Sequence, residues 1–186
     1  MNRATATALT VLALTALAPP ASATPTEARF DGPRSAEDVH CVAEAVFTLD
    51  PGISLQPSSG RLIGKEGPLD CDGVIDGRAV TGRGTWAETL RYGLRALPSC
   101  ANPAGDAEGT WTATLPTADG PLTLTDSGVR YEYGPLQGGG VLGGTVDGQR
   151  HYGRFQVVPL EGDCVSAPIT RVLVRCEEWI VARRGR

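Results

Sequence analysis

The sequence predicts an all-β fold, a single antiparallel barrel or sandwich of about eight to ten short strands. Three observations support this fold class. The chain of 186 residues holds 24 Gly and 14 Pro, so turn-forming residues are frequent. Short β-rich segments lie between those turns, and apolar and polar residues alternate in several of them. The same composition excludes a coiled coil, a helical bundle and a transmembrane bundle.

The first strand is expected over residues 40–49. Its second half, Val-Phe-Thr-Leu, favours an extended backbone, and Asp50-Pro51-Gly52 is a turn sequence that closes it. Residues 35–38 resemble a helix capping box, so a short helical turn before this strand stays open as an alternative.

Two Asp-Gly pairs predict β-hairpins farther along the chain. Asp76-Gly77 and Asp147-Gly148 each lie between β-forming segments, and glycine accepts the positive φ of a type I′ turn. Further turns are expected at Asp119-Gly120 and at residues 126–128.

Alternation predicts the strands between and after these turns. Trp111, Ala113 and Leu115 alternate with threonines, so one face of that strand is expected to pack and the other to meet water. Later strands are expected over residues 129–133, 155–158 and 169–174.

The chain holds five cysteines, an odd number, so at least one thiol is left over from intramolecular disulfides. Their spacing contains no Cys-x-x-Cys pair, which argues against a zinc ribbon. Cys176 shares the apolar face of the last strand, and we expect it to be a buried free thiol unless it pairs between chains. Several pairings of the others are open; the favoured hypothesis joins Cys41 to Cys71 and Cys100 to Cys164.

The N-terminus has the pattern of a secretory signal peptide over residues 1–23. Arg3 provides the positive region, residues 9–18 an apolar run too short to span a bilayer, and Ala21-Ser22-Ala23 the cleavage site. The mature chain is then expected to be secreted, with cleavage after Ala23 and no membrane span. We expect a flexible leader at 24–35, one β domain at 36–182 and a basic tail at 183–186.

The formal charge of the chain is −4 at pH 7, a balance poorly suited to nucleic acid. No segment predicts a cofactor or a metal site. Gly138 to Gly143 satisfies the Gly-x-Gly-x-x-Gly spacing, but the following residues predict strand and turn rather than helix. The glycines are therefore expected to let strands kink or bulge at a barrel corner.

Candidate catalytic side chains are few. His151 lies on the same face of its predicted strand as Phe155 and is expected to be a half-buried, hydrogen-bonded residue. A catalytic triad could be drawn from Ser166, His151 and Asp163, but Ser166 does not lie in a Gly-x-Ser-x-Gly motif that would mark a nucleophile. The carboxylates of Glu132, Glu177 and Glu178 could serve glycoside hydrolysis only if two of them face each other across a cleft.

Tyr131 and Tyr133 share one face of a predicted strand beside Arg130 and Glu132. If they are exposed, their rings form a candidate ligand shelf. Most of the few aromatic residues are needed for the core instead.

Four segments carry a resemblance to a group of proteins: residues 41–55, 71–82, 115–120 and 161–171, with Cys41, Cys71 and Cys164 among them. They resemble small secreted, Gly- and Thr-rich, disulfide-bearing all-β proteins of actinobacteria. The resemblance implies export and four cysteines, which sets Cys176 apart, and it implies no activity.

These patterns favour a monomeric, non-catalytic extracellular binding or interaction module with an unknown partner or small ligand. One alternative is a carrier that holds a small apolar ligand in a lipocalin-like barrel. The other is a secreted glycoside hydrolase. A filled barrel interior would favour the module, and a cavity of roughly 300 Å³ or more would favour the carrier.

Overall fold

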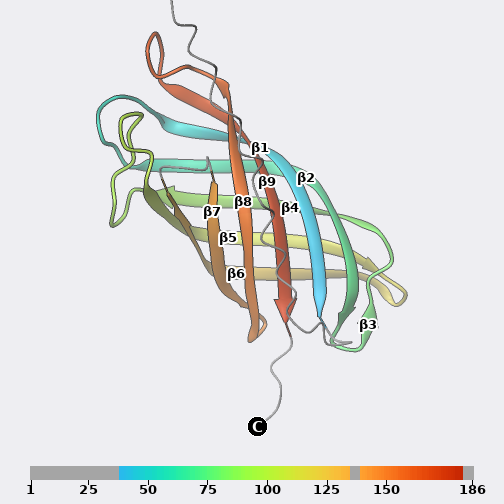
Figure 1. Cartoon of the computed structure of the whole chain (residues 1–186). Coiled ribbons are helices and arrows are strands. Elements are labelled where there is room, and N and C mark those ends of the chain that lie inside the picture. The colour runs from blue at the N-terminus through green and yellow to red at the C-terminus, as the bar shows by residue number, and fades with distance from the viewer. Residues whose placement is uncertain (1–37, 135–138, 182–186) are drawn as a thin grey trace, which may run out of the picture. The chain divides into compact units, whose positions relative to one another are not determined.

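The computed structural model describes residues 38–134 and 139–181 (Figure 1). The predicted signal peptide, leader and basic tail lie outside these residues. The described chain is all-β, a closed barrel of eight antiparallel strands with one short additional strand. No helix in this part of the chain is long and apolar enough to cross a membrane.

The strands have the following bounds: β1 (Val39–Ile53), β2 (Gly60–Ile75), β3 (Arg78–Ala79), β4 (Arg83–Tyr92), β5 (Gly105–Thr117), β6 (Gly120–Tyr133), β7 (Gly139–Val146), β8 (Gln149–Glu161) and β9 (Ile169–Val181). Each barrel strand pairs with the next one along the chain, and β3 extends β2 at one edge. Pairing of β1 with both β9 and β2 closes the sheet on itself. The barrel is therefore an up-and-down meander.

Both predicted Asp-Gly hairpins are confirmed. The φ angles are 49° and 75° at Asp76 and Gly77, and 46° and 79° at Asp147 and Gly148. Positive φ at both central residues is the geometry of a type I′ turn, in which glycine carries no steric cost. Asp119-Gly120 also forms the predicted turn, between β5 and β6.

Two predicted turns are wrong. Residues 126–128 lie inside β6, where the pairing register with β5 shifts between Gly109 and Trp111. A bulge and a turn both favour Asp, Ser and Gly, so the composition misled the prediction. Asp50-Pro51-Gly52 likewise does not end the first strand, because β1 continues to Ile53 with its register to β9 shifted there.

The barrel interior is filled by the inward-facing residues of every long strand. The largest buried side chains include Phe47, Trp86, Tyr92 and Trp111, each at most 1% exposed. The inward and outward residues alternate along β4, β5 and β9, as the period of a half-buried strand requires.

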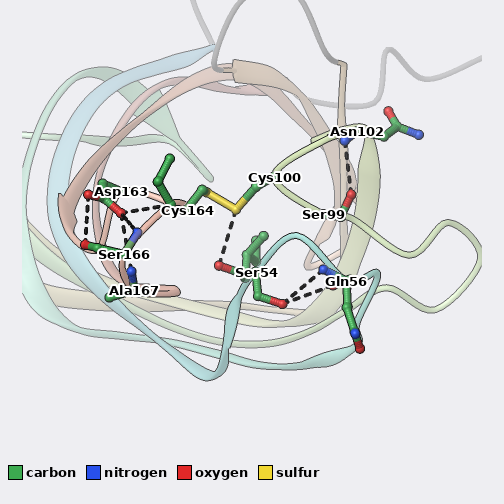
Figure 2. The surroundings of a disulfide bond; sticks show 11 residues. Ser54, Gln56, Ser99, Cys100, Asn102, Asp163, Cys164, Ser166 and Ala167 are labelled. Atoms are coloured by element: carbon green, nitrogen blue, oxygen red, sulfur yellow. Dashed lines mark hydrogen bonds between the residues drawn. A yellow bond between two sulfur atoms is a disulfide. The ribbon is translucent and has the colours of Figure 1, made fainter.

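The structure contains the favoured disulfides. Cys41 on β1 is bonded to Cys71, its direct partner on β2, so this bridge fastens the closing pair of strands. Cys100 is bonded to Cys164 and joins the β4–β5 loop to the β8–β9 loop (Figure 2). Cys176 is a free, buried thiol on β9.

Candidate functional site

The strongest candidate site begins inside the barrel, where six ionisable side chains from four strands are buried. Each is at most 3% exposed. We call them the central cluster: Glu88, Asp126, Tyr131, His151, Cys176 and Glu178. Ionisable groups are rarely buried without a partner, and their concentration in a small domain marks a candidate functional site.

His151 connects two carboxylates of the central cluster. Its Nδ1 lies 3.1 Å from Oδ2 of Asp126, and its Nε2 lies 3.5 Å from Oε2 of Glu178. Burial lowers the pKa of this imidazole, but the hydrogen bonds and charges of the two carboxylates outweigh burial and raise the pKa to about 9. At neutral pH His151 is thus an imidazolium that donates through both ring nitrogens.

Three other members of the central cluster, Glu88, Tyr131 and Cys176, favour their neutral forms. Burial, with the nearby charge of Glu178, raises the pKa of Glu88 well above its ordinary value. The Tyr131 hydroxyl donates a hydrogen bond to Oε1 of Glu88. Burial also raises the pKa values of Tyr131 and Cys176, so the Cys176 thiol has none of the thiolate character of a nucleophile.

Two polar atoms beside His151 lack a hydrogen-bond partner among the described residues. They are Oε1 of Glu178 and Nε1 of Trp111, and the Trp111 ring centroid lies 4.6 Å from that of His151. Buried polar atoms nearly always have a partner, so the Glu178 oxygen is an available acceptor and the Trp111 N–H an available donor for a polar guest.

The barrel wall is interrupted beside this cluster, between β6 and β7. Their pairing runs from Tyr133–Gly140 to Arg130–Gly143 and stops there. From Gly144 to the end of β7, the strand pairs only with β8. β6 bulges at residues 126–128 instead of continuing the ladder. The two strands therefore part over the central cluster.

A groove of about 690 Å³ lies at this interruption, and we call it the seam groove. Its lining includes Asp126, so the groove reaches one of the two carboxylates that contact His151. The full lining is Asp126, Ser127, Gly128, Arg130, Glu132, Val141, Leu142, Gly143, Gly144 and Thr145.

Gly144 allows the Asp126 carboxylate to approach the β7 backbone. A Cβ at Gly144 would lie 1.8 Å from Oδ2 of Asp126, a distance that no side chain tolerates. The other carboxylate oxygen, Oδ1, accepts a 2.9 Å hydrogen bond from the Gly128 N–H. Residues Gly139 to Gly143 of the Gly-x-Gly-x-x-Gly spacing lie in β7, so the segment forms a strand and not a phosphate loop.

Tyr131 and Tyr133 do not form the expected exposed shelf. They share a face, but it is the inner one: Tyr131 is 3% exposed, and both rings pack edge-on against Phe155. Alternation identified a common face without showing which side of the wall it belongs to.

The outer aromatic residues lie on β8 and β9. The Tyr152 and Trp179 rings stack with centroids 5.6 Å apart, Arg150 covers Tyr152 at 4.6 Å, and His40 packs beside Trp179 at 5.2 Å. Because the rings cover one another's faces, this row stabilises the sheet across strands rather than presenting a platform to a ligand.

The three carboxylates considered for hydrolysis do not face one another. Glu177 points outward and contacts Arg154 and His40, whereas its neighbour Glu178 points into the barrel. Glu132 is exposed and lines the seam groove.

The Ser166–His151–Asp163 arrangement is absent from the structure. Asp163 accepts hydrogen bonds from Ser166 within the β8–β9 loop (Figure 2). His151 instead contacts Asp126 and Glu178, and it is fully buried rather than half-buried.

Sequence reasoning missed Glu88 and Asp126 as site residues, and it considered Glu178 only for hydrolysis and not as a partner of His151. The available signal was parity: Glu88 falls between Trp86 and Leu90 on the inner face of β4, and Glu178 continues the inner face of Cys176. An acidic residue at an inward position of a strand is the pattern to search for.

No group of three or more potential metal-binding side chains is found in the described residues. Comparison of the chain with protein-family models, curated proteins and solved structures gave no match.

Proposed function

We propose that the protein is an extracellular, non-catalytic binding module that takes a small polar ligand in the seam groove. The observation that carries this proposal is the end of β6–β7 pairing at Arg130 and Gly143, where a groove opens with buried Asp126 in its lining. Concave sites with a few convergent polar groups are typical of ligand recognition.

The groove lining offers hydrogen-bonding groups beside the apolar side chains of Val141 and Leu142. Ser127 and Thr145 supply hydroxyls, Asp126 and Glu132 carboxylates, and the glycines of β7 let a ligand approach the backbone. The ligand class is thus a small molecule rich in hydrogen-bond donors, such as a polyol or an amine.

The barrel interior supports a module over an apolar carrier. The space along the barrel is occupied by large side chains such as Trp86, Trp111 and Phe47, and by the charged central cluster. An apolar ligand would have to displace both, at the cost of leaving buried charges without partners. The 690 Å³ groove lies in the barrel wall between β6 and β7, so it does not substitute for a lipocalin-like cavity inside the barrel.

Secretion and the monomeric state belong to the same proposal. The two disulfides fit an oxidising compartment, in agreement with the signal peptide expected at residues 1–23.

Amide NMR spectra recorded with a library of small polyols, sugars and amines test the proposal. We expect a binding compound to shift the amides of Gly143, Gly144 and Thr145. Gly143→Leu should abolish these shifts, because a Cβ at Gly143 meets no atom within 4 Å and a larger side chain there extends into the groove that it lines. Thr89→Leu, at an exposed position of β4, is the matched control and should leave them unchanged. Shifts confined to other surfaces, or no shift with any compound, would contradict the proposal.

A further inference from the structure

Two arginines face the same region of the outer wall, on β2 and β4. Arg61 and Arg91 are direct cross-strand partners, and both are exposed. Side chains at such positions have Cβ atoms about 4.5–5.5 Å apart, and like charges there repel each other. Within the described residues, neither guanidinium has a carboxylate at ion-pair distance.

Two neighbouring acids, both on β5, are already engaged, and Asp50 on β1 is the direct cross-strand partner of Arg61. Glu108, the partner of Arg91 on β5, contacts Nε of Arg130 at 3.2 Å. Asp106 accepts hydrogen bonds from the backbone and the side chain of Arg95. The positive charge of Arg61 and Arg91 is therefore not cancelled by these two carboxylates.

The two arginines also line a pocket of about 540 Å³. Its other lining residues are Asp50, Ser59, Gly60, Tyr92, Gly93 and Leu94. Ser59 offers a hydroxyl beside the guanidinium groups, and Asp50 contributes one opposing charge. The pocket thus has a net positive charge and several hydrogen-bond donors.

We infer that the Arg61–Arg91 pocket binds a tetrahedral oxyanion, phosphate or sulfate, either free or carried on a polymer. A guanidinium donates two parallel N–H groups to such an anion, and a pair of guanidiniums on adjacent strands holds it from two sides. The anion also removes the repulsion between the two arginines. This pocket lies on β2 and β4 and is separate from the seam groove, so its test does not depend on the proposed function.

Calorimetric titration with inorganic phosphate and with sulfate, at constant low ionic strength set by chloride, measures the binding. We expect Arg61→Gln and Arg91→Gln each to weaken it about tenfold or more, the effect of losing one charge-assisted hydrogen-bonding group. Arg78→Gln, an exposed position on β3 with the same change of charge, should alter it less than about twofold. Asp50→Asn should strengthen binding, because it removes the opposing carboxylate.

Equal effects of Arg61→Gln and Arg78→Gln would overturn the inference, as would the absence of binding by both anions. A further titration with polyphosphate at the same phosphate concentration separates the two sources. Tighter binding per phosphate indicates an anion carried on a polymer, and equal binding indicates a free anion; either result requires Arg61 and Arg91.

Discussion

The two histidines of the chain lie on opposite sides of the barrel wall, and each contacts two carboxylates. Inside, His151 lies 3.1 Å from Asp126 and 3.5 Å from Glu178. Outside, His40 lies 3.3 Å from Asp72 and 3.1 Å from Glu177. Glu177 and Glu178 are adjacent in β9, so strand alternation sends one carboxylate to each histidine.

The difference between the two groups is solvent. The inner side chains are at most 2% exposed, whereas those of His40, Glu177 and Asp72 are 20%, 29% and 75% exposed. Water screens the outer charges, while the inner ones have only one another. The same contacts therefore add little to stability on the surface, whereas in the interior each charge needs its partner. The seam groove reaches the inner ion group at Asp126.

The largest expected effect comes from removing the inner cation. His151→Ala leaves Asp126 and Glu178 buried without their partner and should lower the free energy of unfolding by about 3–5 kcal/mol. His40→Ala should cost at most about 1 kcal/mol, because its partners stay hydrated. Urea unfolding at pH 7 measures both values, and equal losses would show that burial does not separate the two groups.

A pH dependence of stability should follow from the inner group. The pKa of His151 is raised to about 9 in the folded protein, above an unfolded value of about 6.5. Its contribution, about 3 kcal/mol, is complete below pH 6.5 and is lost as pH rises through 9. The central cluster facing it also holds Glu88, Tyr131 and Cys176, whose raised pKa values add losses of stability of the same sign as pH rises.

Comparison with His151→Ala isolates the histidine from those other groups. Urea unfolding of wild type and variant from pH 6 to pH 9 should give a difference in free energy that shrinks with rising pH. A constant difference would argue that His151 is neutral in the folded protein.

Substitutions of two adjacent glycines that line the seam groove should have smaller effects on stability, and they test the inner ion group at Asp126. Gly144→Ala places a methyl group against Oδ2 of Asp126, which must move away from His151, and we expect a loss of about 1–3 kcal/mol. Gly143→Ala adds its methyl group to open space in the seam groove and should change stability by less than about 0.5 kcal/mol. Thermal unfolding of the two variants gives the contrast, which similar melting temperatures would refute.

The smallest effect is expected on the outer wall. Arg150→Ala removes the cation over the Tyr152 ring and should cost about 0.5–1 kcal/mol, as exposed cation–π pairs do. Raising the ionic strength should reduce this cost, whereas it should leave that of His151→Ala nearly unchanged. Denaturant unfolding at low and high salt provides the measurement.

The sequence predicts the strands and turns of the barrel better than the contacts among its buried side chains. Asp-Gly pairs require positive φ, and alternation in β5 and β9 records a half-buried strand, so turns, strands and the burial of Cys176 were accessible. Which inward side chains contact one another across the barrel depends on the pairing register of the strands and on how the barrel closes. No local sequence pattern contains that information. Asp126 is the clearest case, because its turn-like setting concealed a bulge that aims its carboxylate at His151.

The charge state of His151 is the central claim, and NMR tests it directly. In His40→Gln a single imidazole remains, so its ¹⁵N and ¹³C shifts can be followed without ambiguity from pH 5 to pH 10. We predict that His151 is protonated at pH 7.5 and titrates near pH 9. An imidazole that is neutral at pH 7.5 would contradict the buried ion group, whose Asp126 lines the seam groove.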